Sequence, residues 1–254
     1  MFPVMEIFGP TVQGEGMLVG KLMHFVRTGG CPLRCSWCDE MRSVDPLSVK
    51  QHATWLTAEQ IHTQLSQLPY VGWVSLTGGD PCIHKLDDLI HLLQAELYNV
   101  AVETQGTVFP AWLKRCNAVT FSPKPPSSGN IVNFEPIIEW IDTANVDCCL
   151  KIVVDTTTPE RLAADFNYVL KCQRAVKEAY SNVDVYMTAI TPQGIPKRKI
   201  VKEVLASYRR LTNYVLEFVS GVQDVPGARI RDARMLHIGC QQHTLIWPGE
   251  TEGR

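Results

Sequence analysis

Apolar runs of strand length alternate with amphipathic runs of helix length along most of this chain. The strand-length runs are nearly continuous, a pattern typical of a parallel sheet covered on both faces. Right-handed crossovers would wind such a sheet into a barrel or an open, doubly wound α/β fold. The expected strands cover residues 22–27, 73–78, 99–104, 117–122, 148–154 and 183–189.

Three helices are predicted from their start signals. Thr57 and Gln60 form a capping-box pattern that opens a helix reaching about Leu68. Thr158 is followed by a proline, a residue favoured in the first helical turn, so a long helix is expected to begin there. A third long helical pattern begins near Lys197.

The length and charge of the chain limit its organisation and partners. A chain of 254 residues predicts a single domain, residues 1–254, because α/β barrels of this size often lack an internal boundary. Lys and Arg number 24 against 26 Asp and Glu, so neither nucleic acid nor a membrane surface is expected as a partner, and the substrate is expected to be small. No apolar run approaches the roughly 18 residues needed to cross a bilayer. Nine cysteines without a signal-peptide pattern indicate the reducing cytoplasm.

Residues 29–40, GGCPLRCSWCDE, hold three cysteines in a C-x3-C-x2-C spacing, namely Cys31, Cys35 and Cys38. A tight loop of this spacing can bring three thiolates onto one face of a cuboidal cluster. A [4Fe–4S] cluster normally takes four cysteines, so three leave one iron open to a small molecule, as at catalytic metal sites. The alternatives are buried thiols or a structural zinc site with Asp39 or His24 as the fourth ligand.

Other polar motifs stand at the carboxyl ends of the expected strands, where α/β folds place their sites. Residues 8–16, FGPTVQGEG, carry Gln13 and Glu15, although a hairpin turn alone would explain the glycines. Arg27 could pair with a substrate carboxylate, or it could be an ordinary surface arginine. The glycines in residues 77–81, TGGDP, let the backbone approach a ligand closely.

Two more strand ends, ETQG at 103–106 and SPKP at 122–125, complete this set of motifs. The carboxylate of Glu103 and the hydroxyl of Ser122 could hydrogen-bond ribose, and Lys124 could meet a carboxylate. Taken alone, each of these two motifs is better explained as loop chemistry than as a ligand site, and residues 122–129 form a short Pro/Ser-rich loop.

The cysteine loop, with the aromatic Trp37 before its last cysteine, resembles the signature of radical S-adenosylmethionine (SAM) enzymes. In that superfamily SAM binds the open iron, and an electron from the cluster yields a 5′-deoxyadenosyl radical. The TGGDP turn resembles their GGEP motif, with Asp80 in place of glutamate. Because backbone groups make the SAM contact in that motif, the shorter side chain is expected to be tolerated.

The order of these motifs, from residues 6–16 to HTLIW at 243–247, resembles one family, the 7-carboxy-7-deazaguanine synthases of queuosine and 7-deazapurine biosynthesis. The resemblance implies an α/β fold, an incomplete βα barrel of the radical SAM type, usually as a homodimer. It also implies a carbon–nitrogen lyase that contracts 6-carboxy-5,6,7,8-tetrahydropterin to 7-carboxy-7-deazaguanine with loss of ammonia. The implied cofactors are a [4Fe–4S] cluster, SAM and Mg²⁺, with a reductant such as a flavodoxin or ferredoxin.

The same resemblance implies roles for single residues. Substrate contacts are expected from Val12, Gln13, Gly14, Glu15, Arg27 and Thr77. SAM contacts are expected from Trp37, Cys38, Asp39, Gly79, Glu103, Ser122, Pro123 and Lys124. The expected cluster ligands are Cys31, Cys35 and Cys38, and no catalytic residue is expected beyond the cluster and SAM site.

Glu40 is the clearest departure from the family pattern. Family members usually carry threonine or serine there, and its oxygen ligates Mg²⁺. A glutamate offers hard oxygens to Mg²⁺, but it is longer and charged, so it could also displace the ion, and an altered Mg²⁺ dependence is predicted. Residues 190–199 match the family only loosely, and the chain continues past Trp247, so the roles of this tail and of His243 stay open.

Two other functions share part of this pattern. An activase of a glycyl-radical enzyme would also carry C-x3-C-x2-C, but QGEG and SPKP argue against it. A protein that retains the fold and serves only in interactions would tolerate Glu40 and the divergent residues 190–199.

Overall fold

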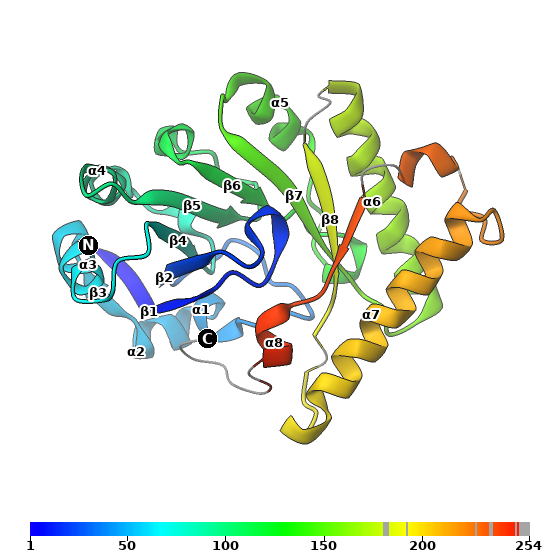
Figure 1. Ribbon diagram of the computed structural model, residues 1–254, viewed down its shortest axis with the longest axis horizontal. Helices are drawn as coiled ribbons and strands as arrows, with labels where there is room; N and C mark the ends of the chain where they lie inside the picture. The colour runs from blue at the N-terminus through cyan, green and yellow to red at the C-terminus, as the bar shows by residue number, and fades with distance from the viewer. Residues whose placement is uncertain (180–182, 192, 227, 234–235, 247, 249–254) are drawn as a thin grey trace.

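The computed structural model describes residues 1–254 apart from 180–182, 192, 227, 234–235, 247 and 249–254. The described residues form one curved sheet with the strand order β3-β1-β2-β4-β5-β6-β7-β8-β9 (Figure 1). Neighbouring strands from β2 to β9 are parallel, whereas β1 is antiparallel to both β2 and β3. Since β3 and β9 end the order without pairing to each other, the sheet is a partial barrel, as predicted.

The strands are β1 (Phe2–Val12), β2 (Leu22–Thr28), β3 (Thr54–Leu56), β4 (Trp73–Gly78), β5 (Asn99–Thr104), β6 (Ala118–Phe121), β7 (Asp147–Val154), β8 (Asp184–Ala189) and β9 (Leu236–Gly239). The α-helices are α1 (Met41–Val44), α2 (Pro46–His52), α3 (Ala58–Ser66), α4 (Asp87–Ala95), α5 (Glu135–Thr143), α6 (Pro159–Ala179), α7 (Lys197–Val219) and α8 (Gln242–Ile246). All six predicted strands are present, within about one residue of their expected ends, and they are β2 and β4 to β8. The strands at the two ends of this order, β3 and β1 at one end and β9 at the other, were not predicted.

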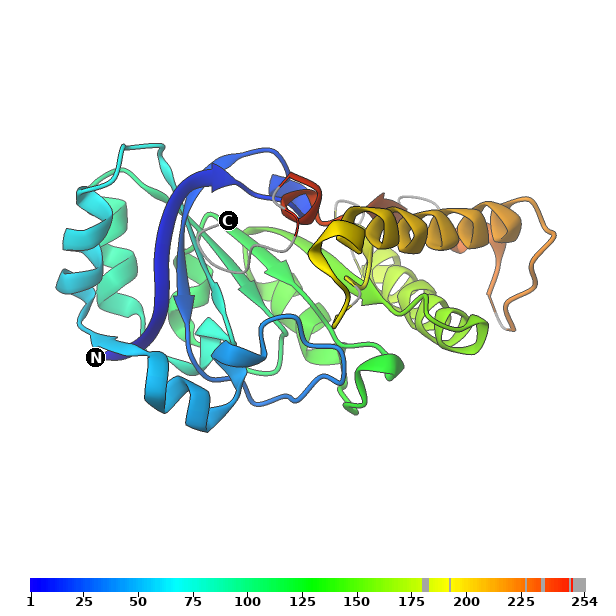
Figure 2. The same cartoon turned by 90° about the horizontal axis from the view of Figure 1, so that it is seen from below.

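The three predicted helices are also present. Thr57 and Gln60 make both hydrogen bonds of the capping box at the start of α3, which ends at Ser66, two residues before the expected end. At the start of α6 the hydroxyl of Thr158 accepts the backbone N–H of Arg161 at 3.3 Å. Figure 2 shows α6 and α7 running side by side beyond the sheet, and they contact each other through the ring of Phe166.

The two faces of the sheet differ in what covers them. Alternate residues of a strand point to opposite faces, and in β7 Leu150 and Ile152 join the large core packed under the helices. Lys151 and Val153, on the other face, line a cavity. The curvature of the sheet encloses this inner face, so the apolar strands carry isolated polar residues there.

No helix in the described part of the chain is long and apolar enough to span a membrane.

Candidate active site

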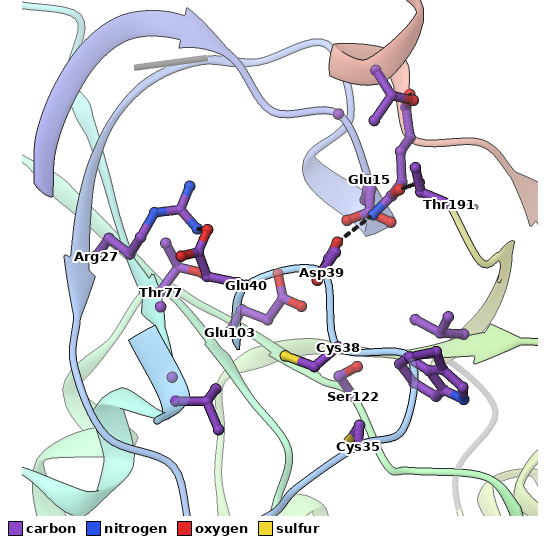
Figure 3. Close-up of a pocket in the computed structure, with 18 of the residues that line it drawn as sticks. Glu15, Arg27, Cys35, Cys38, Asp39, Glu40, Thr77, Glu103, Ser122 and Thr191 are labelled. Atoms are coloured by element: carbon purple, nitrogen blue, oxygen red, sulfur yellow. Dashed lines mark hydrogen bonds and ion pairs between the residues drawn. The ribbon is translucent and has the colours of Figure 1, made fainter. Parts of the chain in front are cut away.

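A cavity of about 450 Å³ opens at the carboxyl ends of the parallel strands (Figure 3). Its volume falls in the range of small-molecule sites, roughly 300–1,000 Å³. Five neighbouring strands each contribute a polar side chain at or near their ends, namely Arg27, Thr77, Glu103, Ser122 and Lys151. The site is therefore built by the sheet, and the loops between strands complete it.

Most of the residues predicted as contacts lie in the wall of this one cavity: Val12, Gln13, Gly14, Glu15, Arg27, Cys31, Cys35, Trp37, Cys38, Asp39, Glu40, Thr77, Gly79, Glu103, Ser122 and Lys124. Pro123 is the exception among the predicted residues, because it is buried beside the cavity and does not line it.

The cysteine loop is fastened to the Pro/Ser-rich loop that follows β6. The indole Nε1 of Trp37 donates to the hydroxyl of Ser127 at 2.9 Å, and the backbone N–H of Ser36 donates to a carbonyl in the same loop. The side-chain amide of Asn130 donates to the Sγ of Cys35 at 3.4 Å. A segment read from the sequence as a plain loop thus holds the cysteine loop in place.

Burial raises the pKa of each of the three loop thiols, to about 11 for Cys38, while the nearby Lys124 ammonium acts in the opposite direction. Lys124 Nζ donates to the Ser122 hydroxyl at 2.8 Å and lies 5.9 Å from the centre of a Trp37 ring. Since cysteines bind metals as thiolates, cluster binding has to supply the free energy that deprotonates them. The Lys124 cation lowers that cost.

The donor set fits a cuboidal cluster better than a single metal ion. In the described part of the chain, no three His, Cys, Asp or Glu side chains gather closely enough to hold one ion. His24, considered as a zinc ligand, is fully buried, with its Nε2 2.8 Å from the carbonyl oxygen of Pro69. A cluster takes each cysteine on a different iron, so its ligands need not meet at one point. The thiols of Cys31 and Cys38 are both near enough to Cys35 for its charge to raise their pKa.

The glycine turn after β4 packs backbone against backbone on the start of the cysteine loop. The N–H of Gly79 donates to the carbonyl of Thr28 at 2.9 Å, and that of Asp80 donates to Gly30 at 2.7 Å. A Cβ on Gly79 would lie 2.0 Å from the Gly30 carbonyl oxygen. The motif therefore needs glycine for this close approach, whatever it binds.

The side chain of Asp80 points away from the cavity and is completely buried. Its carboxylate accepts hydrogen bonds from the Thr104 hydroxyl, the Gln105 side-chain amide and the Cys82 backbone N–H at 2.7 to 3.0 Å. Burial raises the pKa of Asp80, and these hydrogen bonds oppose the rise. Aspartate therefore joins the ends of β4 and β5 and does not line the cavity.

Arg27 is neither a surface residue nor a free cation. Its Nη1 donates to Glu40 Oε2 at 2.8 Å, and its Nε lies 3.5 Å from Glu6 Oε2, with only 18% of the arginine side chain exposed. The second oxygen of Glu40 accepts the Ser43 hydroxyl at 2.9 Å. Both oxygens of Glu40 thus accept hydrogen bonds from protein groups, and a Mg²⁺ ion bound to Oε2 would lie against the positive charge of Arg27.

The loop that carries QGEG is both a hairpin turn and part of the site. The backbone of Gln13 bonds to Lys21 and to Gly20 across the β1–β2 hairpin, at 2.8 and 2.7 Å. The Glu15 N–H donates to the side-chain oxygen of Gln13 at 3.3 Å. The hairpin positions both side chains at the cavity. The glycines therefore serve the hairpin turn and also place the motif at the site.

Several cavity residues were missed from the sequence. Lys151 lies inside an apolar strand, and a single charge within such a run is the signal that could have revealed it. Gln241 had no such signal, because its side-chain amide reaches Asp39 at 3.2 Å from 202 residues away. Gln241 also bonds to Thr191, in the loosely matching segment 190–199 that forms part of the cavity wall. Pro192, the orientation of His243 and the tail beyond residue 248 lie outside the described residues.

A match to a family profile indicates the class of protein. The sequence profile of the Radical SAM superfamily matches residues 25–122, the span that holds the end of β2, the cysteine loop, the TGGDP turn and β3 to β6. This is the superfamily of enzymes that use a [4Fe–4S] cluster and SAM, and the three cysteines of the loop lie within the matched residues.

The particular family follows from two relatives that match along nearly their whole length. The chain is 45% identical to the 7-carboxy-7-deazaguanine synthase of Bacillus subtilis and 32% identical to that of Bacillus cereus, covering 96% of this chain and of each relative. The chain belongs to the 7-carboxy-7-deazaguanine synthase family. The crystal structure of QueE from Escherichia coli shares the fold, with a TM-score of 0.56 and 24% identity over 81% of this chain and 90% of that one.

Proposed function

We propose that this protein converts 6-carboxy-5,6,7,8-tetrahydropterin to 7-carboxy-7-deazaguanine and ammonia by radical ring contraction, in queuosine or 7-deazapurine biosynthesis. The observation that carries the proposal is that the three cysteines, the QGEG loop and Arg27 lie around one cavity although they come from separate parts of the chain. Substrate and product differ by ammonia alone, so the net reaction needs no stoichiometric oxidant. The Bacillus relatives carry the name of this activity.

The charges around the cavity favour one orientation of the pterin. Figure 3 shows Arg27 and Glu15 on opposite sides of the cavity, with Glu103 and Asp39 between them. A substrate carboxylate is attracted by the guanidinium of Arg27 and repelled by the carboxylate of Glu15. The amide of Gln13 and the carboxylate of Glu15 instead suit the N–H groups and carbonyl of the pyrimidinone edge.

Other residues of the cavity would hold the cofactors. Cys31, Cys35 and Cys38 would bind the cluster, and the hydroxyl of Ser122 and the ammonium of Lys124 lie beside it for polar groups of SAM. When bound, the cluster and SAM together supply a carbon radical that abstracts a hydrogen atom. The enclosing sheet would separate that radical from C–H and S–H groups outside the cavity that it could otherwise attack. We assign no step to Mg²⁺, because both oxygens of Glu40 are engaged.

An anaerobic assay of the reconstituted protein tests the proposal. Incubation with SAM, dithionite and the carboxytetrahydropterin is expected to yield a deazapurine product, identified by its absorbance and mass, together with ammonia. Cys35→Ala is the matched control, expected to form no product. Cleavage of SAM without a deazapurine would assign the protein to another radical SAM reaction, such as activation of a glycyl-radical enzyme. No SAM cleavage at all would support a role in interactions only.

The proposal includes a reductant protein and a homodimer. A flavodoxin or ferredoxin is the class of reductant that suits a one-electron acceptor of low potential. Replacement of dithionite by each of these proteins, with turnover as the readout, tests this part. Light scattering on the protein eluting from a gel-filtration column tests the dimer, and a mass near that of one chain would refute it.

A further inference from the structure

Lys151 lies between two carboxylates in the wall of the cavity. Its Nζ is 3.0 Å from Glu15 Oε2 and 2.5 Å from Glu103 Oε1, and only 6% of its side chain is exposed. The two acids come from different parts of the fold, Glu15 from the β1–β2 hairpin and Glu103 from the end of β5. One buried cation therefore joins the QGEG loop to the sheet.

The charges of this triad are unbalanced. One ammonium faces two carboxylates, and burial, which alone would lower the pKa of Lys151, is outweighed by Glu103 and Glu15, so its pKa is raised. Lys151 therefore stays protonated and cannot act as a base. It neutralises one of the two negative charges, which leaves a net negative charge on the triad itself.

One oxygen of the triad lacks a partner. Oε1 of Glu15 is buried and accepts no hydrogen bond from any described residue. The side chain as a whole is nine-tenths buried. A buried carboxylate oxygen without a donor is costly, at about 1–3 kcal/mol. Figure 3 shows the carboxylate of Glu15 directed into the cavity, where a ligand N–H could supply the missing donor.

We propose that Lys151 is a positioning residue that holds Glu15 as a fixed, ionised acceptor for the 2-amino group and ring N–H of the pyrimidinone edge of the substrate. This inference rests on the proposed function. Lys151 fixes Oε2 of Glu15, which leaves Oε1 as the oxygen available to an N–H group of the substrate. The lysine thereby sets which edge of the pterin is recognised, without touching the substrate itself.

A purely structural role for Lys151 would have a different consequence. If the lysine only fastened the hairpin to β7, its loss would weaken binding of any ligand shaped like the pterin. If it positions Glu15, its loss weakens binding chiefly of ligands that carry the amino group. The ratio of the dissociation constants of two such ligands separates the two roles.

The experiment compares 6-carboxytetrahydropterin with its analogue lacking the 2-amino group. Binding is measured by calorimetry on the reconstituted holoprotein with SAM and without a reductant, so that no turnover occurs. The wild type is expected to bind the amino compound about tenfold or more tightly, which corresponds to about 1.4 kcal/mol. In Lys151→Met the Kd of the amino compound is expected to rise about tenfold or more. The ratio of the dissociation constants of the two ligands is expected to fall towards one. Lys151→Arg is expected to restore part of the ratio.

A control variant and a second variant at Glu15 separate the possible outcomes. Lys50→Met removes an exposed lysine of α2 and is expected to change neither Kd. A ratio in Lys151→Met equal to that of the wild type, with intact iron content and melting temperature, would overturn the inference. If Lys151→Met fails to fold, Glu15→Gln serves instead, and an unchanged ratio in that variant has the same meaning. A wild type that forms no deazapurine refutes the proposed function, whereas product formation with a ratio independent of Lys151 refutes this inference alone.

Discussion

The Nη1 of Arg27 donates to Oε2 of Glu40 across 2.8 Å at one end of the cavity. Glu40 thereby places an internal carboxylate on the guanidinium that the proposed substrate carboxylate would use. The two carboxylates would compete for one bidentate donor, and the ion pair has to open or share its donors when the substrate binds. This contact links the departure from the family pattern at residue 40 to substrate recognition.

Glu40→Thr is expected to change the response to Mg²⁺. The threonine would free Arg27 and leave a hydroxyl oxygen where glutamate is now engaged by Arg27 and Ser43. Turnover of this variant is expected to be several-fold higher with Mg²⁺ than with a chelator, whereas the wild type should change by less than about twofold, since its Glu40 oxygens are occupied. Equal Mg²⁺ responses in the two proteins would contradict this. Glu40→Gln, which keeps the length but removes the charge, is the control.

Asn130→Ala is expected to shift the reduction potential of the cluster. The variant removes the N–H donated to Cys35 Sγ at 3.4 Å, and hydrogen bonds to cluster sulfurs favour the more negative, reduced state. A neutral hydrogen bond of about 0.5–1.5 kcal/mol corresponds to a potential lower by roughly 20–60 mV, measurable by a redox titration followed by electron paramagnetic resonance. Asn133→Ala, in the same loop but bonded to Glu135, should leave the potential unchanged. An unchanged potential in Asn130→Ala would show that the hydrogen bond to Cys35 does not affect the reduction potential.

Gly79→Ala is expected to destabilise the junction between the TGGDP turn and the cysteine loop. The added Cβ would meet the carbonyl oxygens of Gly30 and Ser43 at 2.0 and 2.8 Å, and these are backbone atoms that cannot rotate away. A loss of about 2 kcal/mol in unfolding free energy would lower the melting temperature by roughly 4–8 °C and reduce the bound iron. Gly239→Ala, where the nearest atoms lie at 3.8 Å or more, is the control, and equal melting temperatures for the two variants would disprove the explanation.

His24→Gln is expected to remove part of the pH dependence of stability. Burial lowers the pKa of His24 in the folded protein, and its contact with the Pro69 carbonyl opposes this. The unfolded chain therefore takes up the proton first as the pH falls through about 6.5, so the folded state loses stability from that pH downwards.

Urea unfolding of the wild type and of His24→Gln at pH 7.5 and 5.5 measures this effect. The wild type should lose more unfolding free energy than the variant between the two pH values, by about 1 kcal/mol. Groups common to both proteins cancel in this difference. A difference of zero, or one of opposite sign, would show that His24 does not titrate as its burial requires.

The strands β1, β3 and β9, at the two ends of the sheet, could not be predicted from the sequence. The six inner strands are continuous apolar runs, and their pattern alone predicts them, because burial on both faces leaves few polar positions. In contrast, β3 and β9 are short, and β1 contains Gly9 and Pro10. The places of β3 and β9 in the sheet depend on pairing with strands far away in the sequence, which no local pattern records.

The sequence by itself determined the α/β order of strands and helices, the cysteine loop and the motifs at the strand ends, because each depends on neighbouring residues and on chemical type. Only the tertiary structure decided that Arg27 pairs with Glu40 and that Lys151 pairs with Glu15, which lies 136 residues away. Such contacts depend on the curvature of the sheet and on which face of a strand a residue occupies. Charge pairing acts through space, and the fold alone determines which charges become neighbours.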